Sequence, residues 1–185
     1  MTKIKLAIIL LFLGATAVAT AQTPAFTLDR SIPIITAVDG GDIVVKFGPV
    51  KLSFTKDWRF VMDRGVSVGH GPGEGVVFVT VARASESTLK EGVLSPVRIA
   101  TEKAAQVAEG KKHCGTSPSS RFEELVATDD KRIFVAWCQN TFTGVGPVYG
   151  IHYAILSKSG IVRLSGSGRG FGRQMFDKVA LSHKW

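Results

Sequence analysis

Four apolar segments of strand length follow one another between residues 121 and 166, and they constrain the fold more than any other feature. Two tight spacers, TDDK and KSG, separate the first segment from the second and the third from the fourth. Such spacers are too short for a crossover and are rich in turn-forming residues, so they join antiparallel strands. The sequence therefore predicts an antiparallel sheet from RFEELVA (121–127), RIFVAWCQ (132–139), VYGIHYAILS (148–157) and GIVRLSG (160–166).

The first half of the chain carries a second strand pattern. DIVVKFGPVKLSF (42–54) alternates apolar and polar residues on both sides of a Gly-Pro turn, which predicts a β-hairpin with one covered face. Three further segments follow. They are a short strand in DWRFVM (57–62), a glycine-rich loop over 63–75, and a strand in VVFVTVAR (76–83) that is apolar on both faces, as in central strands covered on two sides.

Two segments have helical periodicity. SPVRIATEKAAQVAEG (95–110) has helix-starting residues at Ser95 and Pro96 and a stop signal at Gly110, and a final helix is expected from about Phe171 to Ser182. Strands that are apolar on both faces need cover on both sides. The expected fold class is therefore α+β, with an antiparallel sheet flanked by helices and an N-terminal hairpin in an α/β/α sandwich.

This order of elements, with VKLSFTKDWRF (50–60) near the start and FDKVALSHKW (176–185) at the end, resembles the Mog1/PsbP/DcrB-like superfamily over residues 42–185. The resemblance implies a Mog1/PsbP-like fold and a binding, assembly or chaperone-like role. It brings no catalytic residues with it, because members share a fold and not a chemistry.

The N-terminus predicts export. Two lysines precede the apolar run LAIILLFL (6–13), and small residues stand at Ala19 and Ala21, as in a signal peptide cleaved after Ala21. The apolar run is shorter than a membrane span, so the mature chain is expected to have no transmembrane segment and to be periplasmic or secreted in a bacterium. The expected organisation is a signal peptide (1–21), an extended lead-in (22–41) and a single α+β domain (42–185).

The chain has two cysteines, Cys114 and Cys138. In an oxidising compartment a lone pair predicts a disulfide. The alternative is a cysteine nucleophile beside His113. It is less favoured, because catalytic cysteine and histidine residues usually meet through the fold and not as chain neighbours. The formal net charge of +8 falls to +6 when the signal peptide is removed with its two lysines. Such a basic excess suits a protein partner with an acidic surface, an anionic lipid or an anionic cell-wall polymer.

RLSGSGRGFGRQMF (163–176) places alternating glycines between a strand and a helix, a layout that also occurs in phosphate-binding loops. The third glycine of a dinucleotide fingerprint is replaced here by Phe171 or Arg173, and no strand follows the helix to complete a βαβ unit. No nucleotide cofactor is therefore expected. Arg169 and Arg173 instead flank the start of the last helix, where they are candidates for binding a carboxylate of a partner.

His70 and Glu74, in the 63–75 loop, form a second candidate binding surface. Two ligands are too few for a metal site, so no metal is expected. No RNA-binding aromatic motif is present, so no nucleic acid partner is expected. The predicted function is an exported non-enzymatic binding module of the cell envelope, such as an assembly factor or an immunity protein that neutralises a toxin. The alternative is a small secreted hydrolase with a dispersed active site, which a cleft holding His152, or His70 and Glu74, would favour.

Overall fold

The computed structural model describes residues 25–39, 41–64, 66–71, 75–114, 120–142, 146–169 and 173–185. The predicted signal peptide lies outside these residues. The described residues form strands and three helices in this order: β1 (Phe26–Asp29), β2 (Ile34–Asp39), β3 (Asp42–Phe47), β4 (Val50–Thr55), β5 (Arg59–Asp63), β6 (Val66–His70), β7 (Val76–Ala84), α1 (Glu86–Glu91), α2 (Pro96–Cys114), β8 (Arg121–Ala127), β9 (Lys131–Phe142), β10 (Gly146–Ser157), β11 (Gly160–Arg169) and α3 (Arg173–Leu181).

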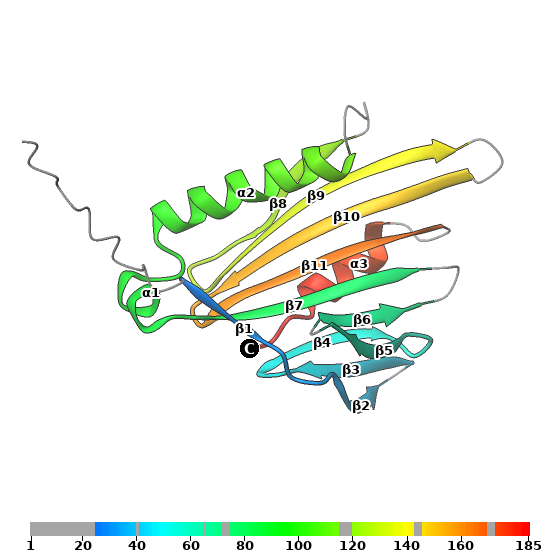
Figure 1. The fold of residues 1–185 in the computed structure, drawn as a ribbon, viewed down its shortest axis with the longest axis horizontal. Coiled ribbons are helices and arrows are strands. Elements are labelled where there is room, and N and C mark those ends of the chain that lie inside the picture. The colour runs from blue at the N-terminus through cyan, green and yellow to red at the C-terminus, as the bar shows by residue number, and fades with distance from the viewer. Residues whose placement is uncertain are drawn as a thin grey trace, which may run out of the picture.

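The larger of two sheets is antiparallel, with strand order β5-β6-β7-β11-β10-β9-β8 (Figure 1). β1 pairs with the second half of β7, on the edge whose first half is taken by β6. The four segments at 121–166 form β8 to β11, and the hairpins between them set the pairing. In the β10–β11 hairpin, for example, Ser157 pairs with Gly160 and every earlier pair follows from that turn.

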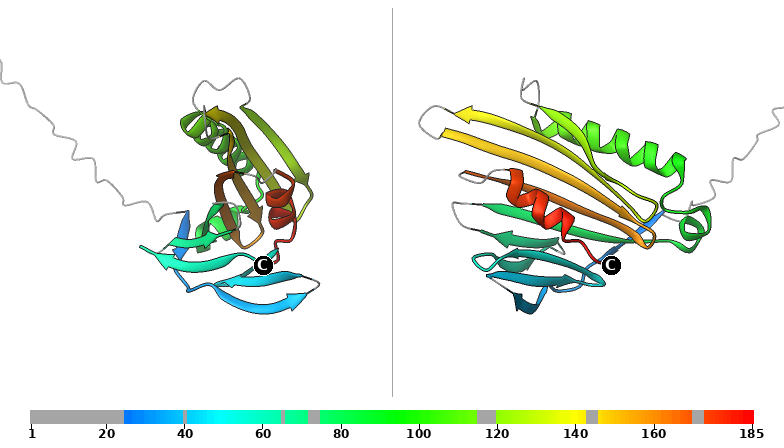
Figure 2. Two further views of the ribbon diagram at one scale, coloured as in Figure 1. Left: turned by 90° about the vertical axis from the view of Figure 1, so that its right-hand side faces the viewer. Right: turned by 180° about the vertical axis from the view of Figure 1, so that it is seen from behind.

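The smaller sheet has the order β2-β3-β4 and packs against one face of the larger sheet together with α3 (Figures 1 and 2). Strict alternation along β3 and β4 turns Val45 and Leu52 inward, where both are fully buried. The resulting core joins them to one face of β7, β9, β10 and β11 and to Phe176 of α3. We call this face of the larger sheet the covered face.

The opposite face of the larger sheet packs against α2, which contacts β8, β9 and β10. The core here is smaller and centres on Phe134, Ala154, Leu156 and Ile161. Gly110 allows the close approach of the helix, because a Cβ at this position would lie 2.7 Å from the Cβ of Ala136. Gly110 is therefore a packing residue and not the helix end, and α2 continues to Cys114.

The predicted α/β/α sandwich is wrong. The molecule is mostly β, and the covered face is covered by a three-stranded sheet with only the nine-residue α3 beside it. The physical reason is that β2 extends the predicted N-terminal hairpin into a three-stranded sheet, and the apolar side of this sheet covers most of the face on which a helix and the hairpin were expected together. Two antiparallel sheets with helices against them therefore replace the expected α/β/α sandwich.

Two further segments differ from expectation. The lead-in over 22–41 contributes β1 and β2, one to each sheet. The loop expected over 63–75 contains β6, in which Gly69 is required because a Cβ there would lie 2.5 Å from Cε1 of Phe60. The glycine residues of this segment therefore led to the prediction of a loop where the structure has a strand. No helix in the described part of the chain is long and apolar enough to cross a membrane.

Candidate functional site

One continuous row of side chains crosses the α2 side of the larger sheet. Its members are direct cross-strand partners, and such partners point to the same face of an antiparallel sheet. From β5 to β8 the row consists of Val61, Val68, Phe78, Ser165, His152, Ala136 and Phe122.

α2 covers only part of this row. The helix contacts β8, β9 and β10 most extensively and reaches β11 through the ion pair between Glu102 and Arg163. It lies away from β5 and β6 (Figure 1). Val61 is 51% exposed and Phe78 is 44% exposed, although both lie in the sheet. We call the uncovered part of this side, carried by β5, β6, β7 and β11, the open face.

A cavity of about 320 Å³ lies where the open face meets α2. The residues that line it come from α2, β10 and β11, and they are mostly polar. They are Ala105, Gln106, Glu109, His152, Tyr153, Arg163 and Ser165. The cavity therefore places hydrogen-bonding groups next to the exposed apolar side chains of the open face.

Polar contacts hold the cavity walls in place. Nδ1 of His152 lies 2.9 Å from the hydroxyl oxygen of Ser165, and Nε2 of Gln106 donates a hydrogen bond to the backbone carbonyl of His152. Arg163 forms an ion pair of 2.5 Å with Glu102 of α2, whose side chain is buried. These contacts fix α2 against β10 and β11, so the cavity has a defined shape before any ligand binds.

Two of the residues predicted to bind a partner belong to the open face. His70 is exposed and pairs with Val76, which pairs with Ser167 in the row next to that of Phe78. Arg169 follows Ser167 by two positions on β11, so strand alternation gives it the same side. The structure thus brings His70 and Arg169 to one face. Glu74 lies outside the described residues.

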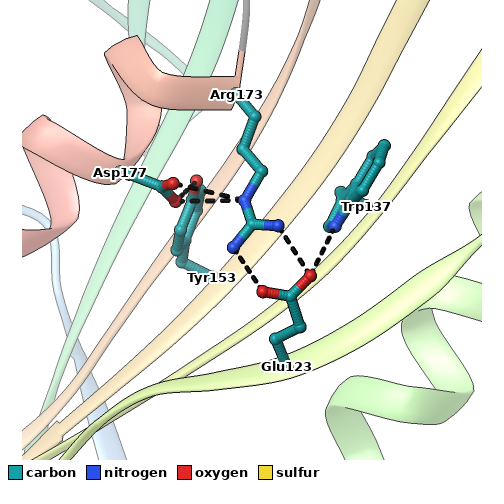
Figure 3. A network of polar contacts seen from close by, with 5 residues as sticks. All are labelled: Glu123, Trp137, Tyr153, Arg173 and Asp177. Atoms are coloured by element: carbon teal, nitrogen blue, oxygen red, sulfur yellow. Dashed lines mark hydrogen bonds and ion pairs between the residues drawn. The ribbon is translucent and has the colours of Figure 1, made fainter.

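Arg173 lies elsewhere and has partners within the protein. Its Nη1 and Nη2 atoms each donate to Glu123 of β8 at 2.7 Å, and Nε lies 3.2 Å from Asp177 (Figure 3). The hydroxyl of Tyr153 donates to the same aspartate at 2.7 Å, and the guanidinium stacks over Trp137, 5.5 Å from the ring centroid. Arg173 thus binds carboxylates of this chain on the covered face, whereas strand alternation gives Arg169 the other side of the sheet, and their joint binding of a partner's carboxylate stays a prediction.

The electrostatics of this network agree with a structural role. The hydrogen bonds from Arg173 are the main cause of the lowered pKa of Glu123, and the same bonds raise the pKa of Arg173. Burial, and then the hydrogen bond to Asp177, raise the pKa of Tyr153. All three groups therefore keep one protonation state at neutral pH, and the network holds α3 to β8 and β10.

The predicted disulfide falls partly outside the described residues. Cys138 is buried in β9 on the α2 side, opposite Gly150, and α2 ends at Cys114. The side chain of Cys114 is not among those described, so the pairing stays a prediction. Within the described part of the chain, no cluster of three or more His, Cys, Asp or Glu side chains is arranged to hold a metal ion.

Sequence reasoning missed most of the cavity, although one signal was available. Counting outward from the KSG turn pairs His152 with Ser165, because the hairpin fixes the register. The contributions of Glu102 and Gln106 depend on where α2 lies over the sheet, and no local pattern specifies that position. The exposure of Phe78 was equally hidden, because VVFVTVAR reads as a strand covered on both faces.

No family model matches this chain, and no curated protein matches it. Among solved structures, it is similar to a protein from Bacteroides thetaiotaomicron VPI-5482 whose crystal structure was determined at 1.50 Å resolution. The TM-score is 0.47 and the identity 11%, over 84% of this chain and 48% of the other, so the chain spans about half the length of that protein. This likeness carries no argument about function, and none of the comparisons bears on the resemblance to the Mog1/PsbP/DcrB-like superfamily.

Proposed function

We propose that this chain is an exported, non-enzymatic binding protein of the cell envelope whose open face holds a segment of a partner protein with an acidic surface. The observation that carries the proposal is the exposure of Phe78 on the inner strand β7 and of Val61 on the edge strand β5, in one row with Ser165 and His152 of the polar cavity. Exposed apolar side chains that lie together within a polar surround are typical of interaction sites.

The charges around the open face favour an acidic partner. Arg59 pairs with His70 across β5 and β6, and Arg169 lies at the far end of β11. The acidic residue on the same side of β5, Asp63, is exposed and lies 3.8 Å from Arg64. An apolar centre with a basic rim is the arrangement that gives affinity and orientation at protein interfaces. An assembly factor and a toxin-neutralising immunity protein would both use such a surface.

Photo-crosslinking at matched positions tests this function. A photoreactive phenylalanine analogue replaces Phe78 in one variant and Val97, which is 78% exposed on α2, in another. Crosslinking in intact cells is expected to give one discrete adduct at position 78 and none at 97, and Arg59→Glu with Arg169→Glu should reduce its yield. Equal adducts at both positions, or none at 78, would remove the open face as a binding site.

Export is part of the same proposal. N-terminal sequencing of the protein isolated from its cells should begin at Gln22, because the basic, apolar and small-residue segments end at Ala21. A chain that begins at Met1 in the membrane fraction would contradict cleavage and leave the binding face to be tested in another compartment.

A secreted hydrolase is the second candidate, favoured by the contact between His152 and Ser165 in the wall of the cavity. A histidine at this distance can accept the serine proton as the hydroxyl attacks a carbonyl. However, Ser165 lies on an inner strand that pairs with β10 and β7. The nearby backbone N–H groups therefore donate to carbonyls of the neighbouring strands and do not form an oxyanion hole. A fluorophosphonate probe should label Ser165, and not a Ser165→Ala variant, if the hydrolase is correct. Absence of labelling would contradict the hydrolase and leave binding as the one remaining candidate function.

A further inference from the structure

Three lysines lie side by side across the outer face of the smaller sheet. Lys46 of β3 pairs directly with Lys51 of β4, and Lys51 pairs with Lys184, which follows α3. All three are exposed, and within the described residues none has a carboxylate partner. Like charges placed directly opposite one another destabilise a sheet. We call these residues the lysine row.

Hydroxyl groups lie next to the lysine row. A cavity of about 310 Å³ is lined by Lys51 and Lys184 together with Thr36, Ala37, Val44, Ser53 and Ser182. The backbone N–H of Ser53 donates to the hydroxyl of Ser182 at 2.8 Å, and that hydroxyl donates to the carbonyl of Val179 at 2.7 Å. Two ammonium groups beside a polar hollow suit a compact anion such as a phosphate group, which accepts several charge-assisted hydrogen bonds.

Apolar side chains border the lysine row on the other side. Ile34 is the direct partner of Lys46 on the same outer face and is 57% exposed, and the nearby Ile32 is 70% exposed. Lysines next to exposed isoleucines match the interface of a membrane, where ammonium groups meet lipid phosphates and apolar side chains enter the acyl boundary. A soluble acidic protein would neutralise the lysines but gives no reason for this placement of the isoleucines.

We propose that the outer face of the smaller sheet is a peripheral docking site for a membrane surface rich in anionic phospholipid. The lysine row would bind the headgroup phosphates, with one phosphate in the cavity between Lys51 and Lys184. The smaller sheet packs its inner side on the covered face of the larger one, so its outer face, which carries the lysine row, is directed away from the larger sheet and from the open face beyond it. Docking through the lysine row therefore leaves the open face directed away from the membrane. This inference rests on a different surface from the proposed function and does not depend on it.

Vesicle sedimentation of the purified mature protein tests the site. Vesicles of phosphatidylcholine alone are compared with vesicles that contain about 30% phosphatidylglycerol. The wild-type protein is expected to bind the anionic vesicles at least about tenfold more strongly, and Lys51→Glu with Lys184→Glu should remove that difference. The matched control is Lys111→Glu with Lys112→Glu, an equal change in charge at exposed positions of α2, and it should change binding by less than about twofold.

Two further measurements keep the test decisive. Ile34→Ser leaves every charge in place, and it should weaken binding to anionic vesicles while keeping its dependence on salt. The melting temperature of each variant shows whether it is folded. Three outcomes would overturn the proposal: equal binding to both vesicle types, binding of inorganic phosphate without vesicle binding, and binding of polyglutamate without vesicle binding. The second would indicate a site for a free phosphate, and the third an acidic protein.

Discussion

The two faces of the larger sheet belong to the same strands but differ in how completely other elements cover them. On the covered face, Tyr153 of β10 is almost completely buried, as are the side chains that pack onto this face from Phe176 of α3 and from Trp58 before β5. On the other face, α2 lies mainly over β8, β9 and β10, and Phe78 and Val61 are exposed on the strands beyond it. The difference predicts that stability comes mainly from the covered face and that the side chains of the open face contribute little to folding, as the proposed binding role requires.

The charged groups of the two faces differ in the same way. Arg173 on the covered face has both ends of its guanidinium bonded to carboxylates from two elements, and Trp137 lies beneath it. Arg163 on the other face has its acidic partner on α2 but also lines a cavity. The first arrangement uses the guanidinium to hold elements of the fold together, whereas the second places a guanidinium in the wall of a cavity.

The largest expected effect is that of removing an aromatic side chain from the covered face. Phe176→Ala should reduce the free energy of unfolding by about 3–5 kcal/mol, because the ring is buried against Trp58 and over Gly166 and would leave a cavity. Chemical denaturation measures the loss. A cost below about 1 kcal/mol would show that the covered face is not the stabilising one.

The next effect concerns the link between α2 and the sheet. If Cys114 and Cys138 form the predicted disulfide, replacing both with serine should cost about 3 kcal/mol, because the bond closes a loop in the unfolded chain. Thiol titration of the denatured, unreduced protein should then find no free thiol. Two free thiols would mean that α2 is held only by packing and by the contacts of Glu102 and Gln106.

Acid should weaken the covered face through His183. This side chain is buried after α3, and neither ring nitrogen has a hydrogen-bond partner among the described residues. Burial, and then the nearby Lys131, lower its pKa to about 4. The unfolded chain therefore binds this proton at a higher pH than the folded chain does, and stability falls as the pH drops below the ordinary histidine value.

The loss should be about 2 kcal/mol between about pH 7 and pH 5, a range above the carboxylate pKa values. Denaturation at several pH values measures it, and His183→Gln should flatten the dependence. The exposed His70→Gln serves as the control and should leave the slope unchanged. A slope that survives in His183→Gln would assign the acid sensitivity to another group.

A smaller effect on stability should distinguish Arg173 from Arg169, which the sequence predicted to form one binding site. Arg173→Ala should cost about 1–2 kcal/mol, since its partner Glu123 is partly exposed and solvent screens the pair. Arg169→Ala, at an exposed position, should change stability by less than about 0.5 kcal/mol. Equal costs for the two variants would contradict the assignment of Arg173 to the fold and Arg169 to the open face.

These contrasts also show what could be predicted from the sequence. Hairpin turns fix local pairing, so β8 to β11 and the register of His152 with Ser165 follow from spacing alone. The apolar residues on both faces of β7 predict that both faces are covered, but they do not show which element covers each face. The hairpin over 42–54 was therefore expected as β structure, but not its third strand, β2, nor that this small sheet covers most of one face.

The site residues also divide into those that local sequence predicts and those that depend on packing. His70 and Arg169 were identified as polar residues in glycine-rich segments, and the fold brings them to one face. Arg173 has the same local signature, but its partner Glu123 lies fifty residues away in β8, a distance that no motif spans. Contacts of this kind depend on the packing of α3 against the sheet, which periodicity does not specify.

The smallest expected effect lies at the centre of the open face and tests the comparison most directly. Phe78→Thr keeps a residue suited to a strand and removes a ring that is already 44% exposed. Its cost should stay below about 1 kcal/mol, against the several expected for Phe176→Ala on the other side of the same sheet. The same denaturation experiment measures both variants. If Phe78→Thr were as damaging as Phe176→Ala, the ring of Phe78 would have to be covered in solution, and the face could not receive a partner without first losing that cover. A small cost together with loss of the crosslinked adduct would instead show that Phe78 acts in binding and not in folding.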